Sequence, residues 1–193
     1  MQEINLYNFL KISITTYFIT VFVFAFWATL TQQSSEIWDG SLAYLPHGCK
    51  VICICFFGYM AIPALFLAEF TGQVLEWPNT DMTFLYAGSI SSILSVVLAV
   101  EIIERTQIAH FKMSNIFLEI NFINYKFILI TIILSALFNS IFTNLVFSQI
   151  AQMPIGVSTI FTFFIGDIVG SLMFITFAVI TLRLILSDQN KTQ

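Results

Sequence analysis

Long apolar stretches, each close to the length that a bilayer-spanning helix needs, dominate this chain. A helix rises about 1.5 Å per residue, so about 20 apolar residues cross the hydrocarbon core of a membrane. Only 9% of the 193 residues are charged, against about 25% in soluble domains. The stretches cover residues 10–30, 51–70, 84–103, 127–147 and 157–186. We therefore predict an all-α, polytopic transmembrane helical bundle, embedded in the lipid bilayer as one domain over residues 1–193.

The largest polar insert, residues 104–126, is too short to fold by itself. Its apolar residues recur at helical spacing, and Arg105, His110 and Lys112 accompany them. This pattern is typical of a helix that lies in the membrane interface with its basic residues near the headgroups. We predict such an interfacial helix over about residues 105–123.

The basic residues predict the orientation, because cytoplasmic loops of membrane proteins are enriched in Lys and Arg. Basic residues occur in the N-terminal segment, in the 104–126 insert and at the C-terminal end: Lys11, Arg105, Lys112, Lys126, Arg183 and Lys191. The rule therefore places the N-terminus, the insert and the C-terminus in the cytoplasm. Five simple spans do not allow this, because they would leave the two termini on opposite sides.

Proline and glycine in the second stretch offer one solution. Pro46 and Gly48 open this stretch, and Gly58 and Pro63 interrupt it. Proline removes a backbone donor and clashes with the preceding turn, so it kinks or breaks a helix. A broken or re-entrant helix pair on the outer side would put both termini inside, and its irregular backbone would line a cavity. A single kinked span that violates the charge rule is the alternative, so we expect five to six spans.

Charged residues inside apolar stretches are costly and often mark functional sites. Glu69, Glu101 and Arg183 lie at the ends of stretches, where reaching the headgroups accounts for them. Lys50 and Asp167 are the stronger candidates, since both are expected toward the outer side. We interpret Asp167 as a buried carboxylate that faces Lys50.

A polar pocket on the outer side follows from this interpretation. Its predicted ligand or signal residues are Pro46, His47, Gly48, Lys50 and Asp167. Trp38, Tyr44 and Trp77 are expected around its mouth. The alternative for Asp167 is structural. A last span that began at Gly166 would place this carboxylate near a helix N-terminus, where the helix dipole stabilises it.

Small and polar residues predict how the helices pack. Gly166 and Gly170 form a small-xxx-small pair that allows the close approach of another helix, and Gly58 and Pro63 are further packing positions. In the fourth stretch a polar seam is formed by Ser135, Asn139 and Thr143. Hydrogen bonds between helices, each worth about 1 kcal/mol, would account for the seam, and a transport path is the alternative.

No catalytic pattern is present: the chain lacks G-x-S-x-G, H-E-x-x-H and a P-loop. His47 and His110 are the only histidines, which makes haem ligation by two histidines between helices improbable. Three cysteines near the start of the second stretch lack further soft ligands and are expected to be apolar fillers. We therefore predict no catalytic, metal or cofactor site, no enzyme activity, and no nucleic-acid partner, since there is no basic patch.

Three elements, in this order, resemble a known family. L-P-H-G at residues 45–48 leads into an apolar helix, residues 110–145 join an interfacial segment to a helix, and G-D-I-V-G occupies residues 166–170. Their order and spacing resemble MASE1, a membrane sensory domain of bacterial signalling proteins. The chain departs from the family in having fewer membrane segments, and in Leu45, where the family usually has tryptophan.

The resemblance implies a multi-pass sensory domain in the bacterial inner membrane, which detects a cue at the outer pocket. In MASE1 proteins a cyclase, phosphodiesterase or kinase module normally follows. None follows residue 186 here, so we expect signalling to a separate protein partner, and a homodimer is also open. Two other functions remain open from the sequence. The chain could be a small solute-binding subunit of a membrane transporter, or an accessory subunit of a membrane complex.

Overall fold

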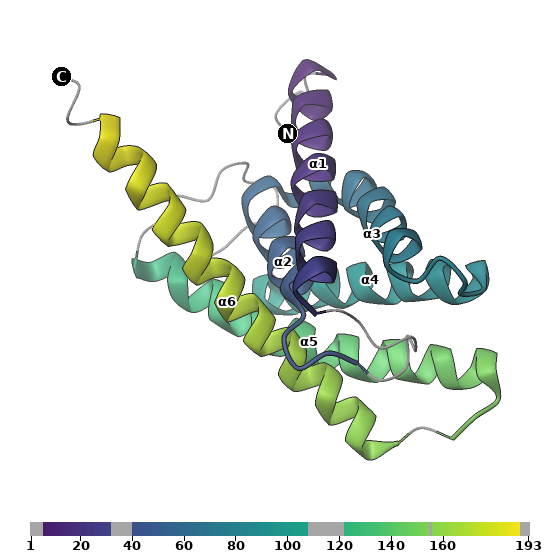
Figure 1. Cartoon of the computed structure of the whole chain (residues 1–193). Coiled ribbons are helices and arrows are strands. Elements are labelled where there is room, and N and C mark those ends of the chain that lie inside the picture. The colour runs from purple at the N-terminus through teal and green to yellow at the C-terminus, as the bar shows by residue number, and fades with distance from the viewer. Residues whose placement is uncertain (1–5, 32–39, 108–121, 155, 190–193) are drawn as a thin grey trace.

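A computed structural model describes residues 6–31, 40–107, 122–154 and 156–189, and these form helices and their connections without a β-strand. The elements are α1 (Leu6–Thr31), α2 (Leu45–Phe57), the short 3₁₀ helix η1 (Gly58–Ala61), α3 (Ile62–Glu76), α4 (Met82–Thr106), α5 (Phe122–Ala151) and α6 (Val157–Gln189). Figure 1 shows them packed as a splayed bundle. The helical fold predicted from the apolar stretches is confirmed.

Five helical stretches are long and apolar enough to cross a membrane: Leu6–Leu30, Leu45–Glu76, Met82–Thr106, Tyr125–Ala151 and Val157–Thr181. They correspond to the five predicted stretches, and the helices extend beyond several of the predicted ends. The predicted interfacial helix at about residues 105–123 lies mostly outside the described residues. Large apolar side chains such as Phe22, Leu67 and Phe177 are exposed on the bundle surface, as a lipid-facing surface requires.

The second apolar stretch is a helical hairpin and not one continuous span. The Lys50 ammonium in α2 lies 2.9 Å from a Glu69 carboxylate oxygen in α3, although 19 residues separate them. In a continuous helix these residues would be about 28 Å apart. The two helices must therefore fold back toward each other, although their combined length and apolar character would allow a single span. The broken, folded-back alternative for this stretch is the one that the structure adopts.

The local sequence explains where the hairpin turns. α2 ends at Gly58, whose φ of 57° and ψ of −144° are accessible to glycine and costly for other residues. Pro63 lies in the first turn of α3, and Pro46 lies in the first turn of α2. At these positions a proline costs no helical hydrogen bond, because the first N–H groups of a helix have no acceptor within it. Glycine ends the first helix, and each proline starts a helix.

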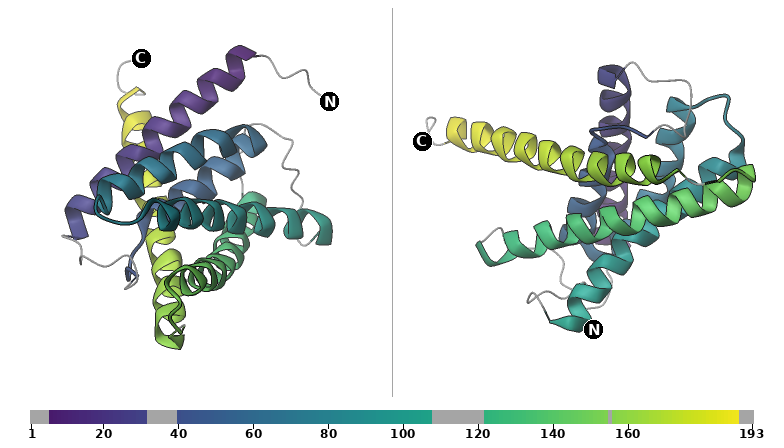
Figure 2. Two further views of the ribbon diagram at one scale, coloured as in Figure 1. Left: turned by 90° about the vertical axis from the view of Figure 1, so that its right-hand side faces the viewer. Right: turned by 90° about the horizontal axis from the view of Figure 1, so that it is seen from below.

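The two helices of the hairpin are short compared with the thickness of a membrane. α2 and α3 have 13 and 15 residues, about 20 and 22 Å, which is shorter than a hydrocarbon core of about 30 Å. The long helices α1, α4, α5 and α6 have 26, 25, 30 and 33 residues, which is enough to cross such a core. The start of α1 and the end of α6 both lie toward the top in Figure 1 and in the left view of Figure 2.

The apolar core lies around α2. Side chains from α2, α3, α4 and α5 contribute to it, and its fully buried members include Cys49, Val51, Ile54, Cys55, Leu65, Val96 and Val100. Cys49 and Cys55 pack as small apolar side chains in this core, in the role expected for the cysteines. This core holds the hairpin between α1 on one side and α5 and α6 on the other.

Glycines allow α6 to approach both α2 and the segment before it. A Cβ atom on Gly48 would lie 2.6 Å from the Ser171 Cα, so α2 and α6 are in backbone contact there. A Cβ on Gly166 would lie 1.7 Å from the Ser41 carbonyl oxygen, and one on Gly170 would lie 2.2 Å from the Tyr44 carbonyl carbon. Another chain segment does approach closely at Gly166 and Gly170, but it is the segment 41–44 and not the helix that was predicted.

The last predicted stretch starts at residue 157, as α6 does, and the structural alternative for Asp167 does not hold. The helix begins at Val157 and not near Gly166, so Asp167 lies about three turns inside it. The unpaired N–H groups of the helix N-terminus are too far away to stabilise this carboxylate. Asp167 depends instead on side chains of neighbouring helices.

We predict that Gly170→Ala destabilises the protein strongly, because the new methyl group would overlap the backbone of Tyr44, which cannot rotate away as a side chain can. Overpacking of this kind costs about 1–3 kcal/mol or more. Thermal unfolding in detergent, followed by size-exclusion chromatography, should show a clear decrease in the midpoint temperature. Gly156→Ala is the matched control, since its Cβ would meet only side-chain atoms of Thr159 and Ser158. Equal stability of the two variants would contradict the close approach.

Candidate functional site

A buried ion pair joins the two halves of the hairpin. The Lys50 and Glu69 side chains are 0% and 1% exposed, and the ammonium donates a hydrogen bond to Glu69 Oε1 at 2.9 Å. The ammonium also donates to the Ser92 hydroxyl of α4 and lies 5.2 Å from the centre of the Tyr44 ring. Two hydrogen bonds and a cation–π contact together compensate the cost of removing this charge from water.

Glu69 is the centre of this first network. Besides Lys50, its Oε1 accepts hydrogen bonds from the Tyr44 hydroxyl and from the Gln73 amide, each at 3.4 Å. Its second oxygen, Oε2, is buried and has no hydrogen-bond partner among the described residues, and the same holds for Gln73 Oε1. The network therefore has unused acceptors, while the Lys50 ammonium already has partners.

A second network surrounds Asp167 of α6. The Asn139 amide donates a hydrogen bond to Asp167 Oδ2 at 2.7 Å, and the Thr143 hydroxyl donates to Asn139 Oδ1 at 3.0 Å. On the other side, His47 Nδ1 lies 3.5 Å from Asp167 Oδ2, and His47 Nε2 is 2.9 Å from the Ser135 hydroxyl. This network connects α2, α5 and α6.

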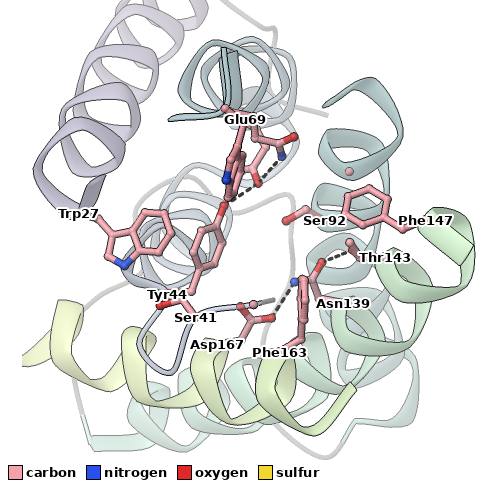
Figure 3. Close-up of a pocket in the computed structure, with 14 residues that line it drawn as sticks. Trp27, Ser41, Tyr44, Glu69, Ser92, Asn139, Thr143, Phe147, Phe163 and Asp167 are labelled. Carbon is pink, nitrogen blue, oxygen red and sulfur yellow. Dashed lines mark hydrogen bonds between the residues drawn. The ribbon is translucent and has the colours of Figure 1, made fainter. Parts of the chain in front are cut away.

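A cavity lies between the two networks. About 620 Å³ of space free of protein atoms lies here, and this volume includes the open mouth. Figure 3 shows Glu69 and Tyr44 on one side and Asp167 and Asn139 on another. The lining residues are Trp27, Gly40, Ser41, Tyr44, Glu69, Gln73, Trp77, Gly88, Ser92, Asn139, Thr143, Phe147, Phe163 and Asp167. They come from the end of α1, the 40–44 segment, α3, α4, α5 and α6.

The structure brings the predicted pocket residues together, although in a different arrangement. Asp167 lines the cavity, while His47 and Lys50 are buried behind it and contact lining residues. Pro46 and Gly48 are buried in α2 and shape the backbone. Of the aromatic residues expected at the mouth, Tyr44 and Trp77 line the cavity. Trp38 lies outside the described residues.

The expected pairing of Lys50 with Asp167 is wrong. Lys50 pairs with Glu69, which the sequence had placed near the headgroups, because α3 folds back and carries Glu69 into the bundle. For Glu101 and Arg183 the interpretation as end-of-helix residues holds. Glu101 pairs with Arg105 one turn away at 2.7 Å, and Arg183 is exposed.

The predicted polar seam is confirmed. Ser135, Asn139 and Thr143 are all buried on one face of α5. Ser135 and Asn139 make hydrogen bonds to α2 and α6, whereas Thr143 supports Asn139. The seam is therefore a connection between helices, and its Asn139 and Thr143 also form part of the cavity wall.

Sequence reasoning missed Glu69, Gln73, Trp27 and Ser92 as members of the site. The signal for Glu69 and Gln73 was present, since they lie one turn apart on the second half of the broken stretch. If the second stretch is assumed to fold back, Glu69 is the acidic residue that comes closest to Lys50. Trp27 is almost fully buried, and its indole donates to the Ala43 carbonyl at 2.7 Å, a contact that no local pattern encodes.

Within the described residues there is no group of three His, Cys, Asp or Glu side chains arranged to hold a metal ion. Comparison of the chain with protein-family models, with curated proteins and with solved structures found no match. The function must therefore be argued from the site.

We predict that Lys50→Met destabilises the protein by about 3–5 kcal/mol, because it leaves the buried Glu69 carboxylate without its cation. The double variant Lys50→Met/Glu69→Gln should recover much of this loss, since the neutral amide still accepts from Tyr44. Unfolding in mixed micelles by titration with sodium dodecyl sulfate measures both effects.

The control for this pair is Glu101→Gln, which removes a carboxylate from an exposed ion pair and should leave stability nearly unchanged. If the double variant were as unstable as Lys50→Met, the loss would not come from an unpaired charge.

Proposed function

We propose that the protein is a MASE1-like membrane sensory domain, which binds a small polar cue in the cavity and signals to a separate partner protein. The observation that carries the proposal is the contact between the two motifs that resemble the family. L-P-H-G lies at the start of α2, and G-D-I-V-G lies in α6. Gly48 of the first motif meets α6 next to the second, and His47 lies 3.5 Å from Asp167. Motifs more than 100 residues apart thus meet beside the cavity.

The route from the cavity to a partner would be α6. Its Asp167 lines the cavity, and its Gly166 carbonyl accepts a hydrogen bond from the Tyr44 backbone N–H at 2.9 Å. A ligand that interacts with Asp167 or displaces Tyr44 would change how α6 packs. α6 continues for more than 20 residues beyond Asp167, so a small rotation at the cavity would reach the far end of the helix. The role is binding and signal transmission, without catalysis.

We place both termini in the cytoplasm and the cavity on the outer side of a bacterial inner membrane. The hairpin supports this topology, because four full passes return the chain to its starting side. The basic residues Lys11, Arg105, Lys126 and Arg183 then all lie near the cytoplasmic ends of their helices. The connection between α3 and α4, which includes Asp81, lies on the outer side with the cavity.

Reporter fusions test this topology. Green fluorescent protein at either terminus should fluoresce, whereas alkaline phosphatase should be active only when inserted between α3 and α4. An active phosphatase at the C-terminus would contradict the hairpin topology, since it would require an odd number of passes.

Gentle co-purification of the tagged full chain from native membranes tests the sensory role. We expect a kinase, cyclase or phosphodiesterase in the purified material. Asp167→Asn should change the activity of that enzyme at least severalfold without lowering the amount of membrane protein. Asp81→Asn is the control, because it makes the same chemical change at an exposed helix cap that does not line the cavity.

The other candidate functions give different results in this experiment. A co-purified ATPase, together with solute uptake that depends on this chain, would replace the proposal with a transport subunit. A partner whose activity is the same with Asp167→Asn and with Asp81→Asn would indicate an accessory role. If no protein co-purifies, the proposal of a separate signalling partner is wrong.

A further inference from the structure

The cavity wall has acidic side chains and no basic one. Two lining residues, Glu69 and Asp167, carry carboxylates, and none of the lining residues is basic. Lys50 lies behind the wall, bound to Glu69 and Ser92, and His47 lies behind it with its Nε2 at the Ser135 hydroxyl. A ligand in the cavity therefore meets carboxylates before it meets any cation.

The unused hydrogen-bonding capacity consists mainly of acceptors. Glu69 Oε2 and Gln73 Oε1 are buried, with their side chains 1% and 5% exposed, and have no partner among the described residues. A buried acceptor without a donor is unfavourable, so these groups favour a hydrogen-bond donor beside them over a further acceptor. The unpartnered donor on the cavity wall is the indole N–H of Trp77, whose side chain is only partly buried.

An anionic ligand fits this wall poorly. The Lys50 ammonium has two hydrogen bonds and a ring contact already, so an incoming carboxylate would have to displace Glu69 to reach it. The displaced carboxylate would remain buried next to the ligand charge. Like charges at short range in a medium of low dielectric constant repel strongly.

Aromatic side chains supply the rest of the wall. Five of the lining residues are aromatic: Trp27, Tyr44, Trp77, Phe147 and Phe163. Aromatic faces attract cations, most strongly where water is excluded, and they also pack against flat apolar groups. Carboxylates, unused acceptors and aromatic rings together form the kind of site that binds an organic ammonium ion.

We propose that the ligand class of this cavity is a small primary amine in its ammonium form, with an apolar body that packs against the aromatic residues. This inference rests on the proposed function, since it names the chemical class of the cue. The ammonium is attracted by the carboxylates of Glu69 and Asp167, which line the cavity from two helices. The ligand thus contacts α3 and α6 at the same time.

Three probes with the same ring and chain test the charge preference: 2-phenylethylamine, 2-phenylethanol and phenylacetate. The purified full chain in lipid nanodiscs is titrated with each probe, and binding is measured by calorimetry and by the fluorescence of the tryptophans. We expect phenylethylamine to bind at least tenfold more tightly than phenylethanol, and phenylacetate to bind more weakly still. Equal binding of the amine and the alcohol, a preference for phenylacetate, or no binding of the amine would overturn the proposal.

Asp167→Asn adds a test of the site. We expect this variant to lose at least tenfold in affinity for phenylethylamine while its affinity for phenylethanol changes little. Asp81→Asn should bind all three probes as the unmodified protein does. Unchanged affinity of Asp167→Asn for the amine would remove Asp167 from the site. If that variant does not fold, the three probes on the unmodified protein still decide the charge preference.

The outcomes separate this inference from the proposed function. Failure of the amine to bind, together with a co-purified signalling enzyme that responds to Asp167→Asn, leaves the sensory role standing and removes the ligand class. Selective amine binding without a co-purified signalling enzyme would keep the ligand class and remove the sensory role.

Discussion

The buried ion pair between Lys50 and Glu69 is the contact on which the architecture depends. A lysine ammonium in the apolar interior is costly unless a carboxylate and further acceptors surround it. Here the carboxylate comes from the other half of the same apolar stretch, which is possible only when that stretch folds back at Gly58. The desolvation cost of both charges therefore disfavours a continuous helix over residues 45–76.

Close backbone contact is the second constraint. The partly buried segment 40–44 runs beside α6, and part of its backbone is hydrogen-bonded to protein groups. The Tyr44 N–H donates to the Gly166 carbonyl, and the Ala43 carbonyl accepts from the Trp27 indole. Only glycine at positions 166 and 170 leaves room for this segment. Irregular backbone is tolerated here because protein covers it and because it borders a cavity.

Sequence periodicity and hydropathy were sufficient for the helices, since a membrane span must be long, apolar and continuous. They also identified Asp167, Lys50 and the seam at Asn139, because polar groups stand out in apolar segments. They did not identify the partner of Lys50. The two forms of the second stretch have the same composition, and the choice between them depends on contacts 19 residues apart. The start of α6 was ambiguous for a similar reason, since apolar residues continue on both sides of Gly166.

The position of the cavity indicates how binding would be transmitted. α3 packs mainly against α1 and α4, whereas α6 packs mainly against α2 and α5. Glu69 and Gln73 lie on α3, and Asp167 lies on α6, so a cation held between them would add an attraction that the empty cavity lacks. A ligand shifts a conformational equilibrium only by the difference in its affinity for the two states. An ammonium ion that interacts with both carboxylates binds more tightly when α3 and α6 are close together. Separating the two helices would remove one of its two counter-charges and so weaken its binding.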